Sequence, residues 1–92
     1  MPRVTSFLFD DDNEEKLAAH GLTIEEVDQI LDEEHVIVPN RKGRRAPILL
    51  IGRNRGGWCI AVPLEPTYDV GCWRPITAWP CKASELRLLR GR

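Results

Sequence analysis

Two arginines and two histidines of this sequence have side chains suited to cleaving a phosphodiester. Planar guanidinium donors match phosphate oxygens in pairs, and converging arginines can stabilise the charge that develops on a phosphorane. Arg53 lies at the end of a predicted strand and Arg74 within the last one. His20 and His35 can act as general bases near neutral pH. These four are the catalytic candidates; the alternatives are solvated or ion-paired arginines and structural histidines.

The charged residues are divided unevenly along the chain, although the net charge is only −1. Residues 1–35 carry two basic and eleven acidic side chains, whereas residues 36–92 carry eleven basic and three acidic ones. A basic surface can attract a polyanion even when the total charge is balanced. The alternative is that the two halves fold together and neutralise one another. On the first interpretation, the predicted RNA-binding residues are Arg44 and Arg45 in a basic loop, and Lys82.

Three tryptophans, Trp58, Trp73 and Trp79, lie in predicted strands. If they are exposed they can stack on nucleic-acid bases, and the alternative is packing in the core. Trp73 and Trp79 share a face of the sheet if their strand continues regularly through Pro75.

The cysteines do not predict a disulfide framework or a zinc site. Cys59, Cys72 and Cys81 are odd in number and have no Cys-x-x-Cys spacing, so we expect each to be a small buried side chain. The histidines are not accompanied by carboxylates at ligand spacing, and no glycine-rich phosphate loop is present. We therefore expect no metal and no small-molecule cofactor.

The first third of the chain predicts two helices. The first spans about residues 11–19, and Gly21 ends it. The second begins with a capping box formed by Thr23 and Glu26. Its apolar residues recur with the helical period on one face, which we expect to enter the core.

The remainder predicts an antiparallel sheet of about four strands and a short C-terminal helix. The strands are expected at 35–38, 47–52, 58–62 and 70–79, and the helix at 83–90. Pro75 must then lie at an edge or a bulge, because proline donates no hydrogen bond. The fold class is α+β, with residues 1–92 as a single domain. One core is expected to contain Ile24, Val27, Leu31, Leu49, Ile51, Ile60 and Val62.

No apolar stretch approaches the roughly 18 residues that span a bilayer. The first six residues lack the apolar segment of a signal peptide. We therefore expect a cytoplasmic protein that does not contact a membrane.

Four short segments together resemble the BrnT family of toxins, within the RelE-like group of small bacterial ribonucleases. They are Phe9-Asp10, then His20-Gly21-Leu22 before the capped helix, then Ile51-Gly52-Arg53 with Gly56-Gly57 turning into a strand, and Arg74-Pro75-Ile76-Thr77-Ala78. The resemblance covers roughly residues 7–86.

The resemblance implies a metal-independent endoribonuclease that cleaves mRNA and is neutralised by a cognate antitoxin protein. Arg74 matches the family's strand arginine, Arg53 a basic position after the hairpin glycine, and His20 the histidine of its His-Gly element. The chain departs from the family pattern in four ways. It has Trp79 where arginine is frequent, Ala19 where lysine is usual, Pro75 in place of an apolar strand residue, and no tyrosine near the C-terminus.

These departures favour two alternative functions. One is a non-catalytic protein-interaction module that keeps the fold, and the other is a nucleic-acid-binding regulator that does not cleave.

Overall fold

A computed structural model describes residues 3–40 and 45–91 of the chain. Its helices are α1 (Asp11–Ala19), α2 (Ile24–Asp28), which continues as the 3₁₀ turn η1 (Gln29–Leu31), and α3 (Ala83–Arg90). Its strands are β1 (Ser6–Phe7), β2 (His35–Pro39), β3 (Ile48–Arg53), β4 (Cys59–Pro66), β5 (Cys72–Pro75) and β6 (Trp79–Pro80). The predicted α+β class is confirmed.

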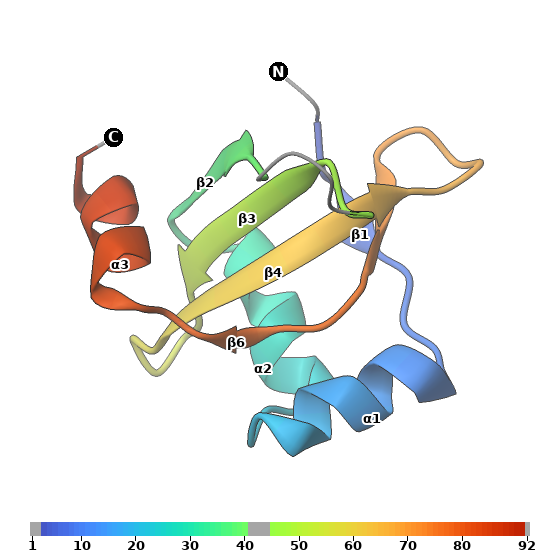
Figure 1. The fold of residues 1–92 in the computed structure, drawn as a ribbon, viewed down its shortest axis with the longest axis horizontal. Coiled ribbons are helices and arrows are strands. Elements are labelled where there is room, and N and C mark those ends of the chain that lie inside the picture. Colours follow the sequence, from blue (N-terminus) through green and yellow to red (C-terminus); the bar gives the residue numbers. More distant parts are fainter. Residues whose placement is uncertain (1–2, 41–44, 92) are drawn as a thin grey trace.

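The strands form one mixed sheet in the order β1-β5-β4-β3-β2, with β6 paired to part of β4 (Figure 1). β1 is parallel to β5, and the other pairs are antiparallel. The expectation of about four strands was too low for two reasons. The short segment before α1 joins the sheet as β1, and the predicted strand 70–79 is divided into β5 and β6.

Pro75 is the last residue of β5. It pairs with Leu64 of β4 on one side, whereas the pairing with β1 ends at Trp73. The proline therefore lies past the end of β1, where its missing N–H deprives no neighbouring strand of a donor. This position agrees with the edge or bulge predicted for it.

The sheet separates two apolar clusters, so the prediction of a single core was wrong. Alternate residues of a strand point to opposite faces. The cluster under α1 and α2 contains Leu17, Val27, Ile30, Leu50, Ile60, Val62 and Leu64, all fully buried, with Ile24 and Leu31 packed against it. The cluster on the other face is smaller and contains Leu49, Ile51, Ala61 and Leu89 of α3. We call these the closed face and the open face of the sheet.

The tryptophans of β5 and β6 also lie on different faces. Trp73 packs against the closed-face cluster and Trp79 against the open-face cluster. The expectation that they share a face fails because the chain leaves the sheet between Pro75 and Trp79.

A disulfide joins Cys59 to Cys81, which corrects the expectation that each cysteine is an isolated apolar side chain. The pairing of β6 with the start of β4 brings the two positions together, and the Cys81 N–H donates to the Cys59 carbonyl at 2.9 Å. Twenty-two positions separate the two cysteines in the sequence, so only the register of β6 places them side by side. Cys72 is a half-buried free thiol.

No helix within the described residues is both long and apolar enough to cross a bilayer.

Candidate functional site

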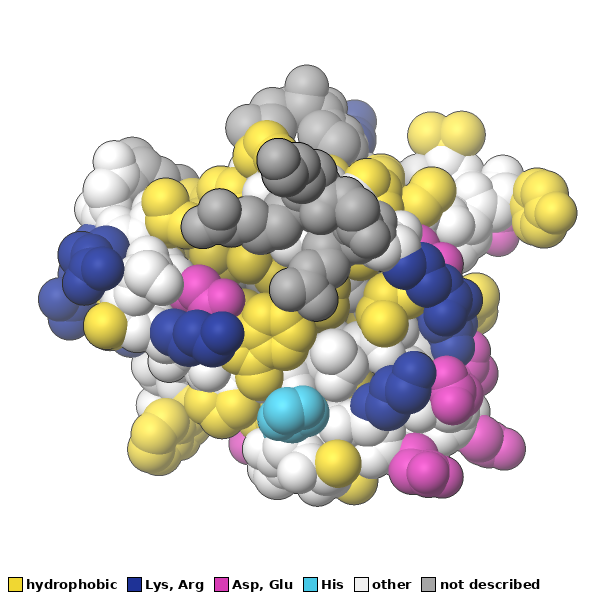
Figure 2. Space-filling view, viewed as in Figure 1, with side chains coloured by type: hydrophobic (Ala, Val, Ile, Leu, Met, Phe, Trp, Pro, Cys, Tyr) yellow, Lys and Arg dark blue, Asp and Glu magenta, His cyan; other side chains and the backbone are white. Residues whose placement is uncertain are grey.

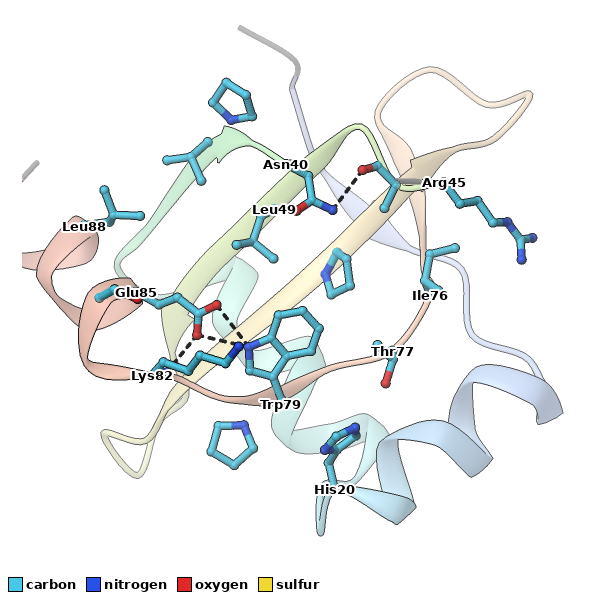
Figure 3. Close-up of a pocket in the computed structure, with 16 residues that line it drawn as sticks. His20, Asn40, Arg45, Leu49, Ile76, Thr77, Trp79, Lys82, Glu85 and Leu88 are labelled. Atoms are coloured by element: carbon cyan, nitrogen blue, oxygen red, sulfur yellow. Dashed lines mark hydrogen bonds between the residues drawn. The ribbon is translucent and has the colours of Figure 1, made fainter. Parts of the chain in front are cut away.

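The open face of the sheet carries a groove of about 940 Å³ between α3, β6 and the end of β2 (Figure 3). α3 contacts β3 and β2 at one side of this face (Figure 1). Leu49, Pro63 and Trp79 contribute apolar surface to the groove, and Arg45, Lys82 and His20 contribute nitrogen-bearing side chains.

The indole of Trp79 is fixed in the groove by a buried carboxylate. Its Nε1–H donates to both oxygens of Glu85, at 3.0 and 3.1 Å. The same carboxylate accepts the backbone N–H of Lys82 at 2.8 Å, which caps the start of α3. The ammonium of Lys82 lies 5.9 Å from the centre of a Trp79 ring, within cation–π range. Glu85 thus determines the position of both groove residues.

His20 reaches the groove from the opposite side, at the end of α1. Its backbone N–H donates to Leu17 within the last turn, and its side chain is exposed. Gly21 follows with a φ of 76°, a conformation that glycine adopts readily, and the chain turns there toward α2. Figure 3 shows the Lys82 side chain on one side of the Trp79 indole and the His20 imidazole on another.

Arg74 has three carboxylate partners. Its Nε donates to Asp10 at 2.8 Å, Nη1 to Glu65 at 2.9 Å and Nη2 to Asp12 at 3.4 Å. The hydrogen bond to Asp10 raises the pKa of Arg74, and the same contact lowers the pKa of Asp10. The side chain of Arg74 is only 16% exposed. A phosphate would have to displace a carboxylate to reach this guanidinium, so the geometry gives Arg74 a structural role.

Arg53 lies at the other end of β4 from Arg74. Arg53 pairs with Cys59, and Arg74 pairs with Glu65. At a rise of about 3.3 Å per residue, these two pairs are about 20 Å apart. The two arginines therefore do not converge on one phosphate. The Nη1 of Arg53 instead donates to the Gly57 carbonyl at 3.1 Å, within the β3–β4 turn.

His35 lies outside the groove, at the start of β2 beside Gly52. Its Nδ1 is 3.0 Å from the Ile30 carbonyl and 2.8 Å from the Glu33 carbonyl. Since carbonyls only accept, this nitrogen carries the hydrogen and links η1 to the sheet. The contacts of His35 are those of a structural histidine.

Two of the three predicted RNA-binding residues line the groove, compared with one of the four predicted catalytic residues. Arg45 and Lys82 both line the groove, whereas Arg44 lies outside the described residues. The guanidinium of Arg45 makes two bonds to Glu65, at 3.0 and 3.1 Å, but its side chain is 65% exposed. The groove therefore brings together Arg45, Lys82 and His20 out of seven candidates.

Ion pairs join the basic and acidic parts of the sequence at two separate places. Arg74 binds Asp10 and Asp12, and Arg55 lies 3.8 Å from Asp32. Figure 2 shows acidic side chains gathered at the α1 side of this face, while basic side chains flank an apolar area at its centre. The ion pairs agree with the interpretation that the two halves neutralise one another, and the interpretation of a basic surface that attracts a polyanion stays a prediction.

Sequence reasoning missed Glu85 and the N-cap of α1. Glu85 stands at the third position of α3, where a capping glutamate is common, and that position was the available signal. Asp10 and Asn13 form a capping box, and the buried Asn13 amide also donates to the Leu8 and Pro75 carbonyls. The second function of Asn13 depends on tertiary structure and has no local signal.

No protein-family model matches this chain, and no curated protein matches it significantly. Within the described ranges, 3–40 and 45–91, no three His, Cys, Asp or Glu side chains are grouped as a metal site. The candidate site is therefore defined by the groove alone.

Proposed function

We propose that the groove binds single-stranded RNA and that the chain is a toxin-like endoribonuclease. The composition of the groove supports this: a tryptophan held by Glu85 lies between Lys82, Arg45 and His20. A fixed indole can stack on an unpaired base, and the neighbouring cations can bind the phosphates on either side of it. The resemblance of the sequence to BrnT toxins supports the same class of substrate.

His20 and Lys82 are the groove residues with the chemistry for cleavage. The substrate's 2′-hydroxyl attacks the adjacent phosphorus while His20 accepts the hydroxyl proton. The bond to the 5′-oxygen breaks, and that oxygen leaves with the proton returned by His20. The products are a 2′,3′-cyclic phosphate and a 5′-hydroxyl end. Lys82 stabilises the charge on the phosphorane.

The test is cleavage of an end-labelled single-stranded RNA, with identification of the cyclic phosphate. We expect His20→Ala to lower the cleavage rate by roughly 10²- to 10⁴-fold, the usual contribution of a positioned general base. Lys16→Ala removes an exposed cation of α1 that lines neither hollow, so it serves as the matched control and should retain activity. Activity that survives His20→Ala would contradict the assignment, and a wild type that neither binds nor cleaves RNA would refute the function.

A second function is supported by the contacts of Arg74. With its guanidinium bound to three carboxylates and the groove floor apolar, the domain has the features of a non-catalytic module that binds a protein partner. The partner implied by the family resemblance is a cognate antitoxin. Growth on induced expression separates the two functions: arrest that His20→Ala relieves favours the ribonuclease, and the absence of arrest favours the module.

A further inference from the structure

Trp58 is a large apolar side chain that the fold holds in solvent. It is 71% exposed, at the end of the β3–β4 turn. The turn is fastened by the buried Asn54, whose side-chain oxygen accepts the Trp58 N–H at 3.0 Å and whose backbone N–H donates to the Trp58 carbonyl at 3.0 Å. The backbone of Trp58 is thus fixed while most of its indole is unpacked, so core packing does not account for this residue.

The exposed indole borders a second hollow, of about 200 Å³, that continues the groove. Its lining includes Trp58, Leu22, His20 and Pro80. His20 and Pro80 also line the groove, so the two hollows meet at these residues. Figure 2 shows the histidine of this face directly beside apolar surface. The groove and this hollow, which adjoin at His20 and Pro80, are together called the track.

We propose that Trp58 is a second base-stacking subsite, which rests on the proposed RNA-binding function of the groove. One base of the strand stacks on Trp79 and another on Trp58, and the sugar-phosphate between them passes His20. This places the backbone beside the residue assigned to proton transfer.

The chemistry of the track defines the class of RNA. Stacking accepts any base, because every base has a π face, so binding should depend little on sequence. Trp58 and Trp79 can each stack only on an unpaired base, so a duplex of the same sequence should not occupy the two subsites. The guanidinium of Arg53, held to the carbonyl of Gly57 in the same turn, adds positive charge near Trp58. Single-stranded RNA is therefore the ligand that the track fits.

The experiment measures the affinity of oligouridine for the wild type, Trp58→Ala and Trp58→Phe by fluorescence anisotropy. Loss of one stacked base should weaken binding roughly 5- to 150-fold in Trp58→Ala, and the phenyl ring of Trp58→Phe should restore much of it. Tyr68→Ala removes another fully exposed aromatic, on the β4–β5 loop, and should bind like the wild type. Thermal melting should change little in all three variants, since neither side chain belongs to a buried apolar cluster.

A second experiment measures the affinity of a uridine dinucleotide for the same variants. If the two subsites are separate, Trp58→Ala should affect the affinity of the dinucleotide less than that of the longer strand. Oligouridine binding that is lost in Trp79→Ala but unchanged in Trp58→Ala would overturn the subsite alone, leaving Trp58 as a contact for a protein partner. A wild type that does not bind oligouridine would overturn both the subsite and the proposed function.

Discussion

The two faces of the sheet are stabilised in different ways, although the same strand contributes to both. On the closed face, β4 presents Ile60, Val62 and Leu64, which are buried under α1 and α2. On the open face it presents Ala61, Pro63 and Glu65, of which Pro63 lines the groove. The groove thus lies on the face where β4 presents small or polar side chains.

The open face replaces apolar packing with specific bonds. The Cys59–Cys81 disulfide anchors the segment before α3, and Glu85 holds Trp79. Near β5, Glu65 joins Arg45 to Arg74. Such bonds can position groove side chains without covering them, which a second apolar layer could not do. Each of the following predictions removes one of these bonds.

The largest effect is expected from the disulfide. Cys81→Ser should lower the free energy of unfolding by about 3 kcal/mol, the loop-closure contribution for a crosslink across a loop of this length. Urea unfolding measures it, and a dithiol reductant should bring the wild type to the level of the variant. Cys72→Ser leaves the crosslink intact and should resemble the wild type under oxidising conditions. Equal stability of Cys81→Ser and the oxidised wild type would show that the crosslink does not stabilise the open face.

The next effect is expected from Arg74→Met, which leaves the carboxylates of Asp10 and Glu65 without their central partner. The loss should be about 1–3 kcal/mol, between the values for exposed and buried pairs. The hydrogen bond from Arg74 lowers the pKa of Asp10 below its ordinary value of 3.8. The stability that this pair contributes is therefore complete above about pH 4 and is lost as the pH falls through the lowered pKa.

Urea unfolding at several pH values measures this dependence. The difference between the wild type and Arg74→Met should be constant near neutral pH and should shrink as Asp10 is protonated. The exposed pair Arg55–Asp32 gives the control, since Arg55→Met should change stability little at any pH. If growth arrest were relieved by Arg74→Met at unchanged stability, Arg74 would have the catalytic role first predicted for it.

The helices and the succession of the main strands along the chain could be predicted because their signals are local. Thr23 and Glu26 form the predicted capping box, and α3 has the predicted bounds. The contacts of Arg74 could not be predicted, because its carboxylate partners stand 9 to 64 positions away in the sequence. Glu65 becomes a neighbour when β4 pairs with β5, and the start of α1 is brought close when β1 pairs with β5. The disulfide depends in the same way on the register of β6.

The sequence indicated which side chains could form a candidate site, but not which of them lie together in the fold. Sequence reasoning selected His20, Arg45 and Lys82 for charge and titration, and the groove unites them. It selected Arg53 and His35 by the same criteria, and their contacts lie in a turn and in a helix–strand connection. Residue type indicates what a side chain can do, whereas the strand register determines which side chains meet.

The smallest effect is expected from Glu85→Gln, which tests whether a charged acceptor is needed to hold the groove residues. The amide keeps one oxygen for the Trp79 Nε1–H but loses the charge that strengthens this bond and the bond to the Lys82 N–H. Replacing a charged acceptor with a neutral one should cost about 1 kcal/mol in unfolding free energy. RNA affinity should fall more than this loss of stability explains, because both Trp79 and Lys82 become less fixed. The matched control is Glu33→Gln, an exposed glutamate on the η1–β2 connection, outside the groove. If Glu85→Gln lowers stability but leaves RNA affinity unchanged, the carboxylate only caps α3, and the fixed indole is not what makes the open face a binding surface.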